Sequence, residues 1–332
     1  MKKKAVVTGG AGFIGSHLTE ALLKKGLQVV VIDNLSTGRT QNLKDFASDP
    51  GLTVVKADIN DVAKIKDHFK DAEYVYHVAA LADIVPSMVD PLKYHHSNVD
   101  GTVNILEIVR EVCPKVKKFV YVASSSCYGI PDKCPTPETA EIRPEYPYAL
   151  TKYLGEQIVL HWAKIYKLPA VSLRFFNVYG PRSRTSGTYG AVFGVFLAQK
   201  LANKPFTVVG DGTQTRDFTF VTDVVSALMT AAESGIVGDV FNVGSGNTYS
   251  VNRLVELLGG KITYIPKRPG EPDCTFADIS KITKSLNWQP KVSFEEGVKI
   301  LLNNIDYWRE APVWTPETIK DATKDWFKYL SK

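Results

Sequence analysis

Tyr148 and Lys152 lie four residues apart, a spacing that places two side chains on the same face of a helix. A tyrosine has a pKa of about 10 and is a poor base at neutral pH. A nearby ammonium group favours the phenolate and so makes the tyrosine a better base. The pair therefore predicts chemistry in which a base removes the proton of an alcohol while the alcohol carbon gives up a hydride.

A run of hydroxyl groups precedes this pair, in the segment Ser124 to Gly129. Ser124 follows the apolar run 118–123, which predicts a strand, so it falls at the carboxyl end of that strand, where ligands bind in open α/β sheets. Its hydroxyl can share the substrate proton with Tyr148. A tyrosine and a lysine at this spacing are common by chance, with the lysine merely exposed. The serine run and a glycine-rich turn near the N-terminus favour the catalytic interpretation.

Three glycines, Gly9, Gly12 and Gly15, follow the apolar run 4–8 and open the helical pattern 13–25. Glycines at such a turn allow a sharp bend, the close approach of a pyrophosphate and close packing of helix on strand. The start of the helix adds unpaired N–H groups and the positive end of its dipole. A plain tight turn is the structural alternative, but the order of strand, turn and helix predicts a dinucleotide site.

Asp33 ends the second apolar run, 28–32, about 20 residues further along the chain. A carboxylate at this place accepts hydrogen bonds from a ribose 2′-hydroxyl and repels a 2′-phosphate, which predicts NAD rather than NADP. Arg39 is close in sequence and can soften that preference. Asp58, after the third expected strand, either reaches the adenine or caps a helix that begins near Asp61, and both interpretations stay open.

The first half of the chain alternates short, almost continuously apolar runs with helical patterns. Strands are predicted at 4–8, 28–32, 53–56, 74–78 and 118–123, and helices at 13–25, 98–112 and 148–166. Strands without polar alternation are typical of a parallel sheet that helices cover on both faces. This succession predicts an α/β fold with a Rossmann-type, doubly wound parallel sheet.

The sequence pattern changes near residue 180, after which the predicted elements are smaller and Gly and Pro often interrupt them. We predict an NAD-binding Rossmann domain at 1–180, which also carries the catalytic residues. A smaller C-terminal α/β region at 181–332 is predicted to bind mainly the substrate, with the chain crossing back between the two. The segment 181–190 is rich in Gly, Ser, Arg and Thr and predicts a mobile loop. The stretch from residue 297 is predicted to be mostly helical, interrupted at Pro312 and Pro316, with aromatic residues packed inward.

The composition is that of an ordinary globular protein, with 44% apolar residues and a formal charge of +5 over 332 residues. The excess charge is spread over many lysines, so no nucleic-acid partner is predicted. Neither a signal peptide nor a stretch of about 20 apolar residues is found, so no membrane association is predicted. The cysteines Cys113, Cys127, Cys134 and Cys274 have no metal-site spacing. We interpret them as reduced thiols in a cytoplasmic protein, with metal binding as the weaker alternative.

These features together resemble the extended short-chain dehydrogenases/reductases, and within them the nucleotide-sugar epimerases, to about Trp308. The segments that carry the resemblance are Thr8 to Leu18, Asp33 to Leu35, His77 to Ala80, Ser124 to Gly129, Tyr148 to Lys152, Arg174 to Gly180, Gly210 to Asp217 and Arg268 to Glu271. The resemblance implies catalysis by Ser124, Tyr148 and Lys152. It also implies tightly bound NAD, held by Gly9, Gly12, Phe13, Ile14, Gly15, Asp33, Asn34, Asp58, Ile59, Ala79, Ala80, Tyr148, Lys152 and Phe175.

The resemblance further implies which residues meet a nucleotide-diphosphate sugar. Arg216 and Arg268 would hold the diphosphate, for which a guanidinium group is suited because it is always charged and presents a fixed fork. A surface salt bridge with Asp217 or Asp223 is the structural alternative for Arg216. The other implied substrate residues are Ser125, Ser126, Asn177 for a phosphate or sugar oxygen, Ala191 and Val192 at the start of the segment around the base, Glu271 for the nucleotide ribose, and Thr275.

Several reactions share this scaffold, and the residue two positions before Tyr128 separates them. Members of the family that dehydrate or decarboxylate the sugar carry a glutamate there, whereas this chain has Ser126 and no carboxylate from Ser124 to Tyr128. The resemblance therefore implies epimerisation. Tyr148 takes the proton of the sugar 4-hydroxyl, the 4-keto sugar turns over in the pocket, and the hydride returns to its other face. Cys127 differs by one position from the catalytic cysteine of 3,5-epimerases, and we expect it only to pack.

The size of the sugar is predicted from Thr275. In the enzymes that this chain resembles, the residue at this position walls the C2 side of the sugar, and a small residue admits an N-acetyl group. We therefore expect UDP-GlcNAc and UDP-GalNAc as substrates, with UDP-Glc and UDP-Gal as further candidates. The open alternatives are another nucleotide sugar (GDP-, CDP- or a uronic acid), another ring carbon, a net oxidoreductase, and a dinucleotide-sensing regulator without catalysis.

Two further expectations concern the surface of the molecule. Members of the family often form homodimers through the two helices that match 98–112 and 148–166, and the resemblance implies a homodimer here. The tail 306–332, with Trp308, Trp314 and Trp326, extends beyond the usual end of an epimerase. Three roles for the tail stay open: it covers the C-terminal region, it contacts the substrate pocket, or it binds a partner.

Overall fold

Seven parallel strands form the central sheet, in the order β11-β6-β5-β4-β1-β2-β3. The computed structural model of the protein describes residues 2–183 and 191–331. The strands of this sheet are β1 (Lys4–Thr8), β2 (Gln28–Asp33), β3 (Leu52–Lys56), β4 (Tyr74–His77), β5 (Lys118–Ser124), β6 (Ala170–Phe175) and β11 (Val240–Val243). The predicted Rossmann-type fold is confirmed, and each of the five predicted strands agrees to within one residue at either end.

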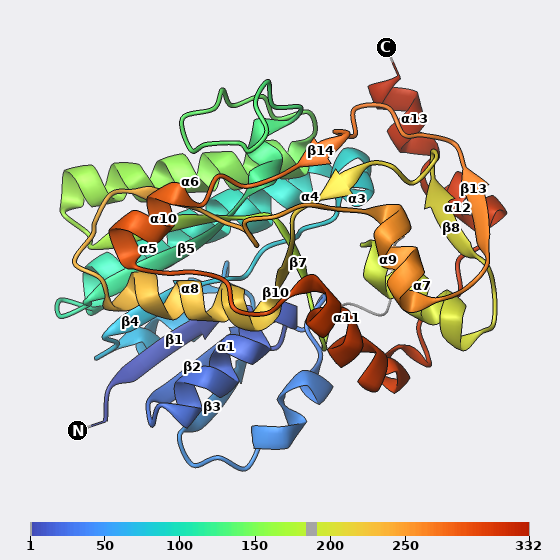
Figure 1. Cartoon of the computed structure of the whole chain (residues 1–332). Helices are drawn as coiled ribbons and strands as arrows, with labels where there is room; N and C mark the ends of the chain where they lie inside the picture. Colours follow the sequence, from blue (N-terminus) through green and yellow to red (C-terminus); the bar gives the residue numbers. More distant parts are fainter. Residues whose placement is uncertain (1, 184–190, 332) are drawn as a thin grey trace.

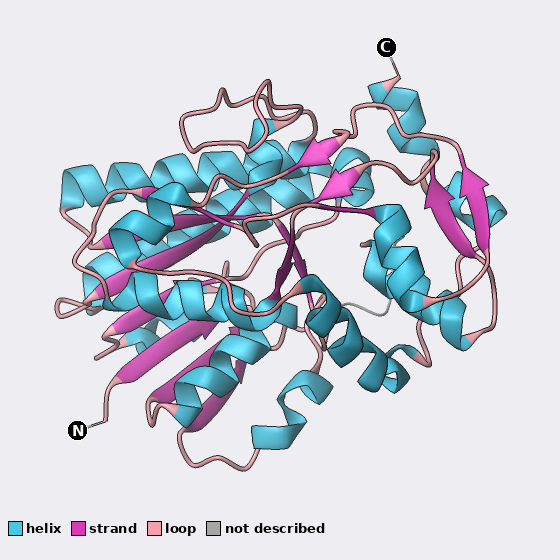
Figure 2. Cartoon of the chain, viewed as in Figure 1, coloured by secondary structure: helices cyan, strands magenta, loops and turns pink. Residues whose placement is uncertain are grey.

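Helices cover both faces of the sheet, as Figures 1 and 2 show. One face packs against α1 (Phe13–Lys24) and α8 (Val221–Glu233), and the other against α5 (Gly101–Val112) and α6 (Pro147–Tyr166). Neighbouring strand residues alternate between the two cores, so that Ala5 and Val7 lie in the first core and Val6 in the second. Because both faces are buried, the strands are apolar at every position rather than at every second one.

The topology places a switch point between β1 and β4, because the chain fills one side of β1 with β2 and β3 before it returns to the other side. The loops after β1 and β4 therefore diverge and leave a crevice at the carboxyl edge of the sheet, which is where ligands bind in such folds. The glycine turn follows β1, and the segment Val78 to Ala80 follows β4. The sequence thus brings its first candidate binding residues to this crevice.

Two of the predicted helices begin differently from the prediction. The helix expected at 98–112 starts as a π-helical segment, η3 (His96–Asp100), and continues as α5. The helix expected at 148–166 begins one residue earlier, with Pro147 in its first turn, where a missing N–H group costs nothing. Pro316 begins α12 in the same way, after Thr315, whose hydroxyl accepts a hydrogen bond from the backbone N–H of Thr318.

The second half of the chain builds a smaller region around its own aromatic core. Tyr179, Phe193, Phe218 and Phe294 pack ring against ring there, together with the fully buried Trp308. The strands of this region are β7 (Asn177–Tyr179), β8 (Phe206–Val209), β9 (Thr215–Arg216), β10 (Phe218–Phe220), β12 (Tyr249–Ser250), β13 (Ile262–Ile265) and β14 (Cys274–Thr275). Its helices are α7 (Val192–Leu201), α9 (Val251–Leu258), α11 (Phe294–Asn303), α12 (Pro316–Ala322) and α13 (Lys324–Leu330). Helix α10 (Ser280–Leu286) instead packs against β11 and the first core of the central sheet.

Short helical segments complete the part of the chain that the structure describes. They are η1 (Thr40–Phe46), α2 (Val62–Ile65), η2 (Lys66–Phe69), α3 (Ile84–Val89), α4 (Pro91–His95), η4 (Ser125–Tyr128) and η5 (Ile305–Trp308). The end of the chain is largely helical, as predicted, and both Trp308 and Trp326 are buried. The mobile loop predicted at 181–190 falls mostly on residues 184–190, which lie outside the described residues.

The prediction of four reduced thiols is wrong for two of the cysteines. Cys134 and Cys274 form a disulfide across 140 residues of sequence, whereas Cys113 and Cys127 are free and buried. The long connection between η4 and α6 runs beside β14, and Thr136 donates its backbone N–H to Phe276 O at 2.7 Å. This pairing brings the two cysteines together, and sequence spacing gave no sign of it.

The disulfide predicts a thiol count that is simple to measure. In denaturant, a thiol-reactive dye should label two cysteines per chain before reduction and four after reduction, because only Cys113 and Cys127 carry free thiols. Peptide mapping of the labelled protein should place both early labels on these two residues. Four labels without reduction would contradict the bond between Cys134 and Cys274.

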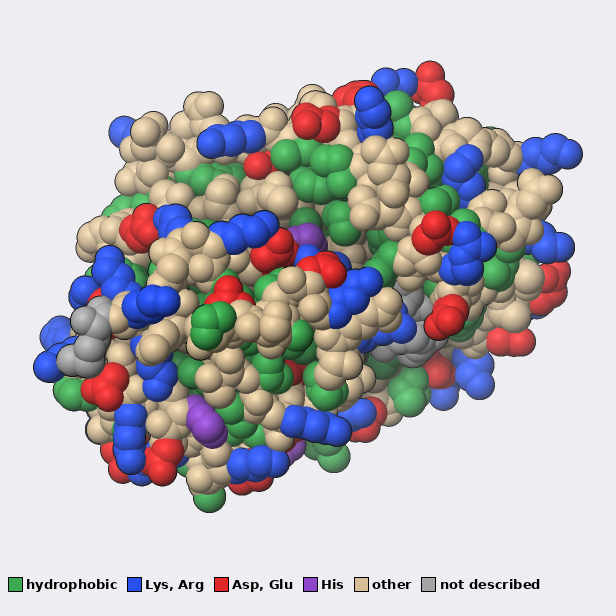
Figure 3. Space-filling view, turned by 90° about the horizontal axis from the view of Figure 1, so that it is seen from below, with side chains coloured by type: hydrophobic (Ala, Val, Ile, Leu, Met, Phe, Trp, Pro, Cys, Tyr) green, Lys and Arg blue, Asp and Glu red, His purple; other side chains and the backbone are tan. Residues whose placement is uncertain are grey.

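The surface carries charges of both signs. On the face shown in Figure 3, lysine and arginine side chains are interspersed with aspartate and glutamate rather than gathered into one block. Within residues 2–183 and 191–331, no helix is both long enough and apolar enough to cross a membrane. The same residues hold no cluster of three or more His, Cys, Asp or Glu side chains that could bind a metal ion.

Candidate active site

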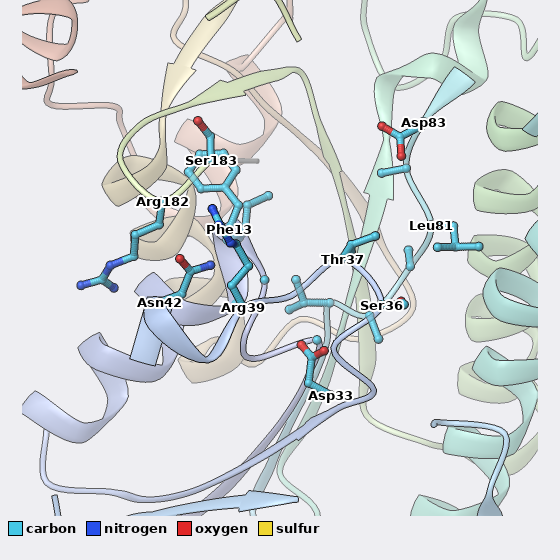
Figure 4. A pocket seen from close by; sticks show the side chains of 18 of the residues that line it. Phe13, Asp33, Ser36, Thr37, Arg39, Asn42, Leu81, Asp83, Arg182 and Ser183 are labelled. Atoms are coloured by element: carbon cyan, nitrogen blue, oxygen red, sulfur yellow. The ribbon is translucent and has the colours of Figure 1, made fainter. Parts of the chain in front are cut away.

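Two adjoining cavities open at the carboxyl edge of the central sheet. The first, of about 400 Å³, is lined by the glycine turn and by Asp33, and we call it the glycine cavity (Figure 4). The second, of about 500 Å³, is lined by Ser124, Tyr148 and Lys152, and we call it the tyrosine cavity. Phe13 and Ile14 line both cavities, so a ligand in one cavity can reach a ligand in the other.

The glycine turn is as tight as the sequence predicted. Gly9 has a φ of +71°, and a Cβ atom there would lie 2.7 Å from the backbone nitrogen of Ala79. A Cβ atom on Gly15 would lie 2.1 Å from the carbonyl oxygen of Gly9. Side chains at these positions would push β1, α1 and the segment after β4 apart. The backbone of the turn therefore borders the cavity directly, as a pyrophosphate site requires.

Behind the turn, His77 ties β4 to its neighbours. Its Nδ1 lies 2.7 Å from the Thr8 hydroxyl, and its Nε2 lies 3.0 Å from the Thr102 hydroxyl on α5. Burial lowers the pKa of His77 to about 3, so the ring is neutral and its role is structural. The Thr8 hydroxyl also accepts from the backbone N–H of Ala79 at 3.3 Å, which holds the segment after β4 against the turn.

Asp33 is held at the edge of the glycine cavity by backbone donors. Its side chain accepts from the N–H groups of Ala11 at 3.0 Å and Leu35 at 2.8 Å. Burial raises the pKa of Asp33, against these hydrogen bonds, which lower it. A buried carboxylate at this point fits the ribose 2′-hydroxyl of NAD and disfavours the additional phosphate of NADP.

The structure decides the open question about Asp58. Asp61, not Asp58, caps the helix α2, since its side chain accepts from the backbone N–H of Lys64. Asp58 instead lines the glycine cavity, where its carboxylate accepts from the Asn34 amide at 2.7 Å. Ile59, Ala79 and Ala80 line the same cavity, as the sequence analysis expected of cofactor residues.

Arg39 lines the glycine cavity from its other side, as Figure 4 shows. Its guanidinium carbon lies 5.8 Å from the centre of the Tyr307 ring, and the Tyr307 hydroxyl donates to Asn42 at 2.7 Å. The C-terminal segment therefore contacts the first cavity.

Tyr148, Ser124 and Lys152 come together at one wall of the tyrosine cavity. Ser124 ends β5 and caps η4, where its Oγ accepts from the backbone N–H of Ser126 at 3.2 Å and lies 3.1 Å from the Ser126 hydroxyl. Burial raises the pKa of Tyr148, and a hydrogen bond with Ser124 opposes that rise. The ring of Tyr146 stacks on Tyr148, with 6.4 Å between ring centres and 8° between planes. The phenol is thus fixed in place beside the serine hydroxyl.

Lys152 is buried one helical turn from Tyr148. Its ammonium lies 4.4 Å from the centre of the Tyr121 ring, and Tyr121 in turn donates its hydroxyl to the Lys152 carbonyl at 3.2 Å. Burial lowers the pKa of Lys152 to about 7, against the nearby carboxylate of Glu156, which raises it. A lysine with a pKa of about 7 can gain or lose a proton near neutral pH.

A buried ion pair supports α6, the helix that carries Tyr148 and Lys152. The Glu156 carboxylate accepts from Arg174 Nη2 at 2.6 Å and Nε at 3.0 Å, and both side chains are at most 6% exposed. Arg174 Nη1 donates to the Tyr128 hydroxyl at 2.8 Å, and that hydroxyl donates to Asn242 at 2.7 Å. This network joins α6 to β6, η4 and β11, and so connects the elements that carry Tyr148 and Ser124.

The two predicted diphosphate arginines both line the tyrosine cavity and pair with one carboxylate. Arg216 Nη2 lies 3.0 Å from Glu271 Oε1, and Arg268 Nη1 lies 3.9 Å from Glu271 Oε2. Only 8% of Arg216 is exposed, so the alternative of a surface salt bridge with Asp217 is wrong. Asp217 is itself fully buried and accepts from the backbone N–H groups of Ser245 and Ala277.

The other predicted substrate residues fall into two groups. Ser125, Ser126, Asn177, Ala191, Val192 and Glu271 line the tyrosine cavity, and so does Phe175 from the cofactor set. Thr275 is not among its lining residues. Its hydroxyl donates to Asn177 Oδ1 at 2.7 Å, so Thr275 lies behind Asn177. In the geometry observed, Thr275 is thus linked to the cavity through its hydrogen bond with Asn177.

Comparison with known proteins agrees with this geometry. A profile of the GDP-mannose 4,6 dehydratase family matches residues 6–301. A putative UDP-glucose 4-epimerase of Methanocaldococcus jannaschii is 37% identical over 306 residues, which cover 90% of this chain and 97% of that protein. The chain belongs to the extended short-chain dehydrogenases/reductases. Within this family it is similar to nucleotide-sugar epimerases, and the predicted family and enzyme class are confirmed.

Solved structures of the family superpose closely. The UDP-N-acetylglucosamine 4-epimerase of Methanobrevibacter ruminantium, in complex with UDP-N-acetylmuramic acid, has a TM-score of 0.85 at 34% identity and covers 92% of this chain and all of its own. A UDP-glucuronic acid 4-epimerase of Bacillus cereus, in complex with UDP-glucuronic acid and NAD, has a TM-score of 0.84 at 34% identity and covers 92% of this chain and 99% of its own. NAD is the cofactor of the family, as predicted, and the glycine cavity of this member fits it.

Some residues in or next to the cavities escaped the sequence analysis. Tyr146 stacks on Tyr148, and its place two residues earlier in the chain could have indicated this. Thr207, Val209 and Gln214 line the tyrosine cavity from β8 and the loop after it, and they carry no motif of their own. Trp326 lines the same cavity from α13, at the far end of the chain. Its contribution depends on tertiary contacts alone.

Proposed function

We propose that this protein epimerises C4 of a UDP-hexose, with UDP-GlcNAc and UDP-GalNAc as the favoured pair and UDP-Glc and UDP-Gal as further candidates. NAD, when bound, supplies the nicotinamide that accepts a hydride from the sugar and returns it. The observation that carries the proposal is the tyrosine cavity itself. It joins Ser124, Tyr148 and Lys152 at one wall to Arg216 and Arg268 at the other, and it adjoins the glycine cavity.

The wall with Tyr148 handles the proton. Tyr148 Oη takes the proton from the sugar 4-hydroxyl. When the hydride returns to the opposite face of C4, Tyr148 gives a proton back to the 4-keto oxygen. Ser124, hydrogen-bonded to Tyr148, shares this proton. Lys152, when charged, favours the phenolate form of Tyr148 from one helical turn away. Because this wall is buried, water competes little for the proton.

The wall with the arginines holds the substrate. Arg216 and Arg268 present two guanidinium forks to the diphosphate, and Glu271, between them, keeps both in position until the nucleotide binds. Anchoring at the diphosphate leaves the sugar able to turn, which a change of configuration at C4 requires. The segment Ser124 to Tyr128 contains no carboxylate that could expel a hydroxyl group, so dehydration, the reaction named by the family profile, is not proposed.

The test is NMR of the purified protein, without added NAD, incubated separately with UDP-GlcNAc and with UDP-Glc. We expect the C4 epimer to appear and to reach an equilibrium mixture, because NAD stays bound and the reaction has no net redox change. No conversion of either sugar by protein that contains NAD would contradict a UDP-hexose substrate and redirect the search to GDP-, CDP- or uronic-acid sugars. Release of NADH during turnover would indicate a net oxidoreductase instead.

The choice between sugars is proposed to depend on Thr275. Replacing Thr275 with tyrosine adds a large ring beside Asn177, which lines the cavity, and removes the hydroxyl that bonds it. We expect kcat/KM for UDP-GlcNAc to fall at least about 10-fold more than kcat/KM for UDP-Glc, since overfilling a packed site costs about 1–3 kcal/mol. The matched control is Thr275→Ser, which keeps the hydroxyl and should retain both activities. Equal losses on the two sugars would contradict this role for Thr275.

The organisation of the protein remains part of the proposal. We propose a cofactor region at 1–180 and a mainly substrate-binding region at 181–332, and a homodimer formed through α5 and α6. Ile165 and Tyr166 at the end of α6 are about half exposed, which supports an interface there. A cytoplasmic location is also proposed, although the disulfide between Cys134 and Cys274 removes the argument from reduced thiols.

A further inference from the structure

The C-terminal helix α13 lies outside the region that matches the family, which ends at residue 301. In Figure 1 this helix lies at the end of the chain, and it packs on α3. Its one buried residue, Trp326, is 5% exposed and lines the tyrosine cavity, together with Ile84 and Val85 of α3. A segment that the family match does not include thus completes the wall of the candidate substrate site.

Trp326 makes two contacts with the loop that carries Arg268. Its indole N–H donates to the Pro269 carbonyl at 2.7 Å. The guanidinium carbon of Arg268 lies 5.4 Å from the centre of the indole, a distance at which a cation is attracted to an aromatic face. One tryptophan therefore binds both the backbone of the loop and the side chain that the loop presents.

The loop has no regular secondary structure, although ion pairs of Lys267 with Asp273 and of Arg268 with Glu271 connect its two ends. It connects β13, which ends at Ile265, to β14, which begins at Cys274, and the structure assigns no helix or strand between them. Gly270 turns the loop with a φ of +70°, and a Cβ atom there would lie 3.6 Å from Leu330 Cδ1, so the end of α13 lies near this turn. Helix α13 thus adjoins the loop at Trp326 and at Leu330.

The indole of Trp326 and the Glu271 carboxylate, 3.9 Å away, are among the neighbours that hold the Arg268 guanidinium. Holding a long side chain in its binding geometry before the ligand arrives reduces the entropy that binding would otherwise cost. An arginine held in this way binds a diphosphate more tightly than the same arginine on a loose loop.

We propose that Trp326 is a positioning residue, which holds the Arg268 loop so that the guanidinium binds the diphosphate of the nucleotide sugar. This inference rests on the proposed function, because it requires a substrate with a diphosphate. Trp326 does not touch the reacting carbon in this assignment. Its loss should weaken binding of the nucleotide and leave the proton-transfer wall of Ser124 and Tyr148 unchanged.

The experiment measures UDP binding by calorimetry and steady-state kinetics in the NAD-loaded protein. Trp326→Ala should weaken UDP binding about 10- to 100-fold, since it removes one cation–π contact and one hydrogen bond that hold the loop. The KM for the UDP-sugar should rise by a similar factor with kcat within about 3-fold, the signature of lost uniform binding. Trp326→Phe, which keeps an aromatic ring and loses the N–H donor, should lose about 3- to 10-fold.

A double-mutant cycle separates positioning from general support of the fold. If Trp326 acts through Arg268, adding Trp326→Ala to Arg268→Ala should weaken UDP binding by less than about 2-fold. Full additivity would overturn the proposal, and so would unchanged UDP affinity in Trp326→Ala. Tyr329→Ala is the matched control, because Tyr329 lies on the same helix and is 57% exposed. It should bind UDP as the wild type does, and a loss equal to that of Trp326→Ala would overturn the proposal as well.

This design distinguishes a failure of the proposed function from a failure of the positioning role of Trp326. Wild-type protein that binds UDP but converts no UDP-sugar would contradict the proposed function, while the variants still test Trp326 through UDP binding. Wild-type protein that does not bind UDP would overturn both. If Trp326→Ala does not fold, Trp326→Phe decides, and unchanged UDP affinity in that variant overturns the positioning role.

Discussion

Tyr148→Phe should lower kcat by about 10²- to 10⁴-fold, the range expected when a general acid–base group is removed. Phenylalanine keeps the ring that stacks on Tyr146 and loses only the hydroxyl, which hydrogen-bonds to Ser124. Lys152 remains on the next turn of α6, and the arginine wall is untouched. The loss should therefore appear in kcat and not in binding.

The measurement pairs initial rates of epimerisation with calorimetry. UDP affinity and the amount of bound NAD should stay within about 2-fold of the wild type, because neither depends on the phenol proton in this mechanism. Tyr166→Phe is the control, since Tyr166 is a half-exposed tyrosine at the other end of the same helix. A Tyr148→Phe protein that keeps more than about a tenth of its turnover would show that another group moves the proton.

Arg174→Met should reduce stability by about 3–5 kcal/mol, the usual cost of leaving one member of a buried ion pair without its partner. The Glu156 carboxylate is 1% exposed and would keep only the Ser172 hydroxyl, at 2.9 Å, among its present partners. The Tyr128 hydroxyl would lose its donor as well. Unfolding in urea at a fixed NAD concentration measures the change, because bound NAD itself stabilises the fold.

Two variants make this prediction specific. Arg253→Met removes an arginine that pairs with Glu256 and Glu295 at the surface, and it should cost less than about 1 kcal/mol. Adding Glu156→Gln to Arg174→Met removes the unpaired charge and should recover part of the loss. Equal stability of Arg174→Met and Arg253→Met would contradict a structural role for the buried pair.

The local part of this architecture was predictable from the sequence. The strands of the central sheet are continuously apolar because helices bury both of their faces, and the limits of β1 to β5 were predicted to within one residue. The other two strands of the sheet, β6 and β11, were not predicted. The start of one helix was not predicted correctly. The helix predicted to begin at Asn98 starts instead as the π-helical segment η3, which includes Asn98, and continues as α5. The Asn98 side chain bonds both backbone groups of Leu81 and the Thr151 hydroxyl, and a pattern of helical periodicity does not report such contacts.

The predicted site residues also divide into those that local sequence spacing places and those that only the tertiary structure places. The glycine turn, Ser124 and the pair of Tyr148 and Lys152 lie at strand ends or on one helix face, and short sequence spacing determines such positions. The position of Asp58 could not be predicted, because the sequence does not show whether an aspartate that precedes a helix is the residue that caps it. Thr275 also needed it, since only the fold places this residue behind Asn177.

The sequence by itself determined five strands of the sheet, the dinucleotide cradle and the candidate proton-transfer groups, because apolar runs, the glycine turn and the spacing of Tyr148 and Lys152 are local patterns. Tertiary structure alone decided the disulfide of Cys134 with Cys274, the place of Glu271 between two arginines, and the contact of Trp326 with Arg268. The first of these joins residues 140 positions apart and the last joins residues 58 positions apart. Their partners are chosen by how separate elements pack, and no local pattern encodes that choice.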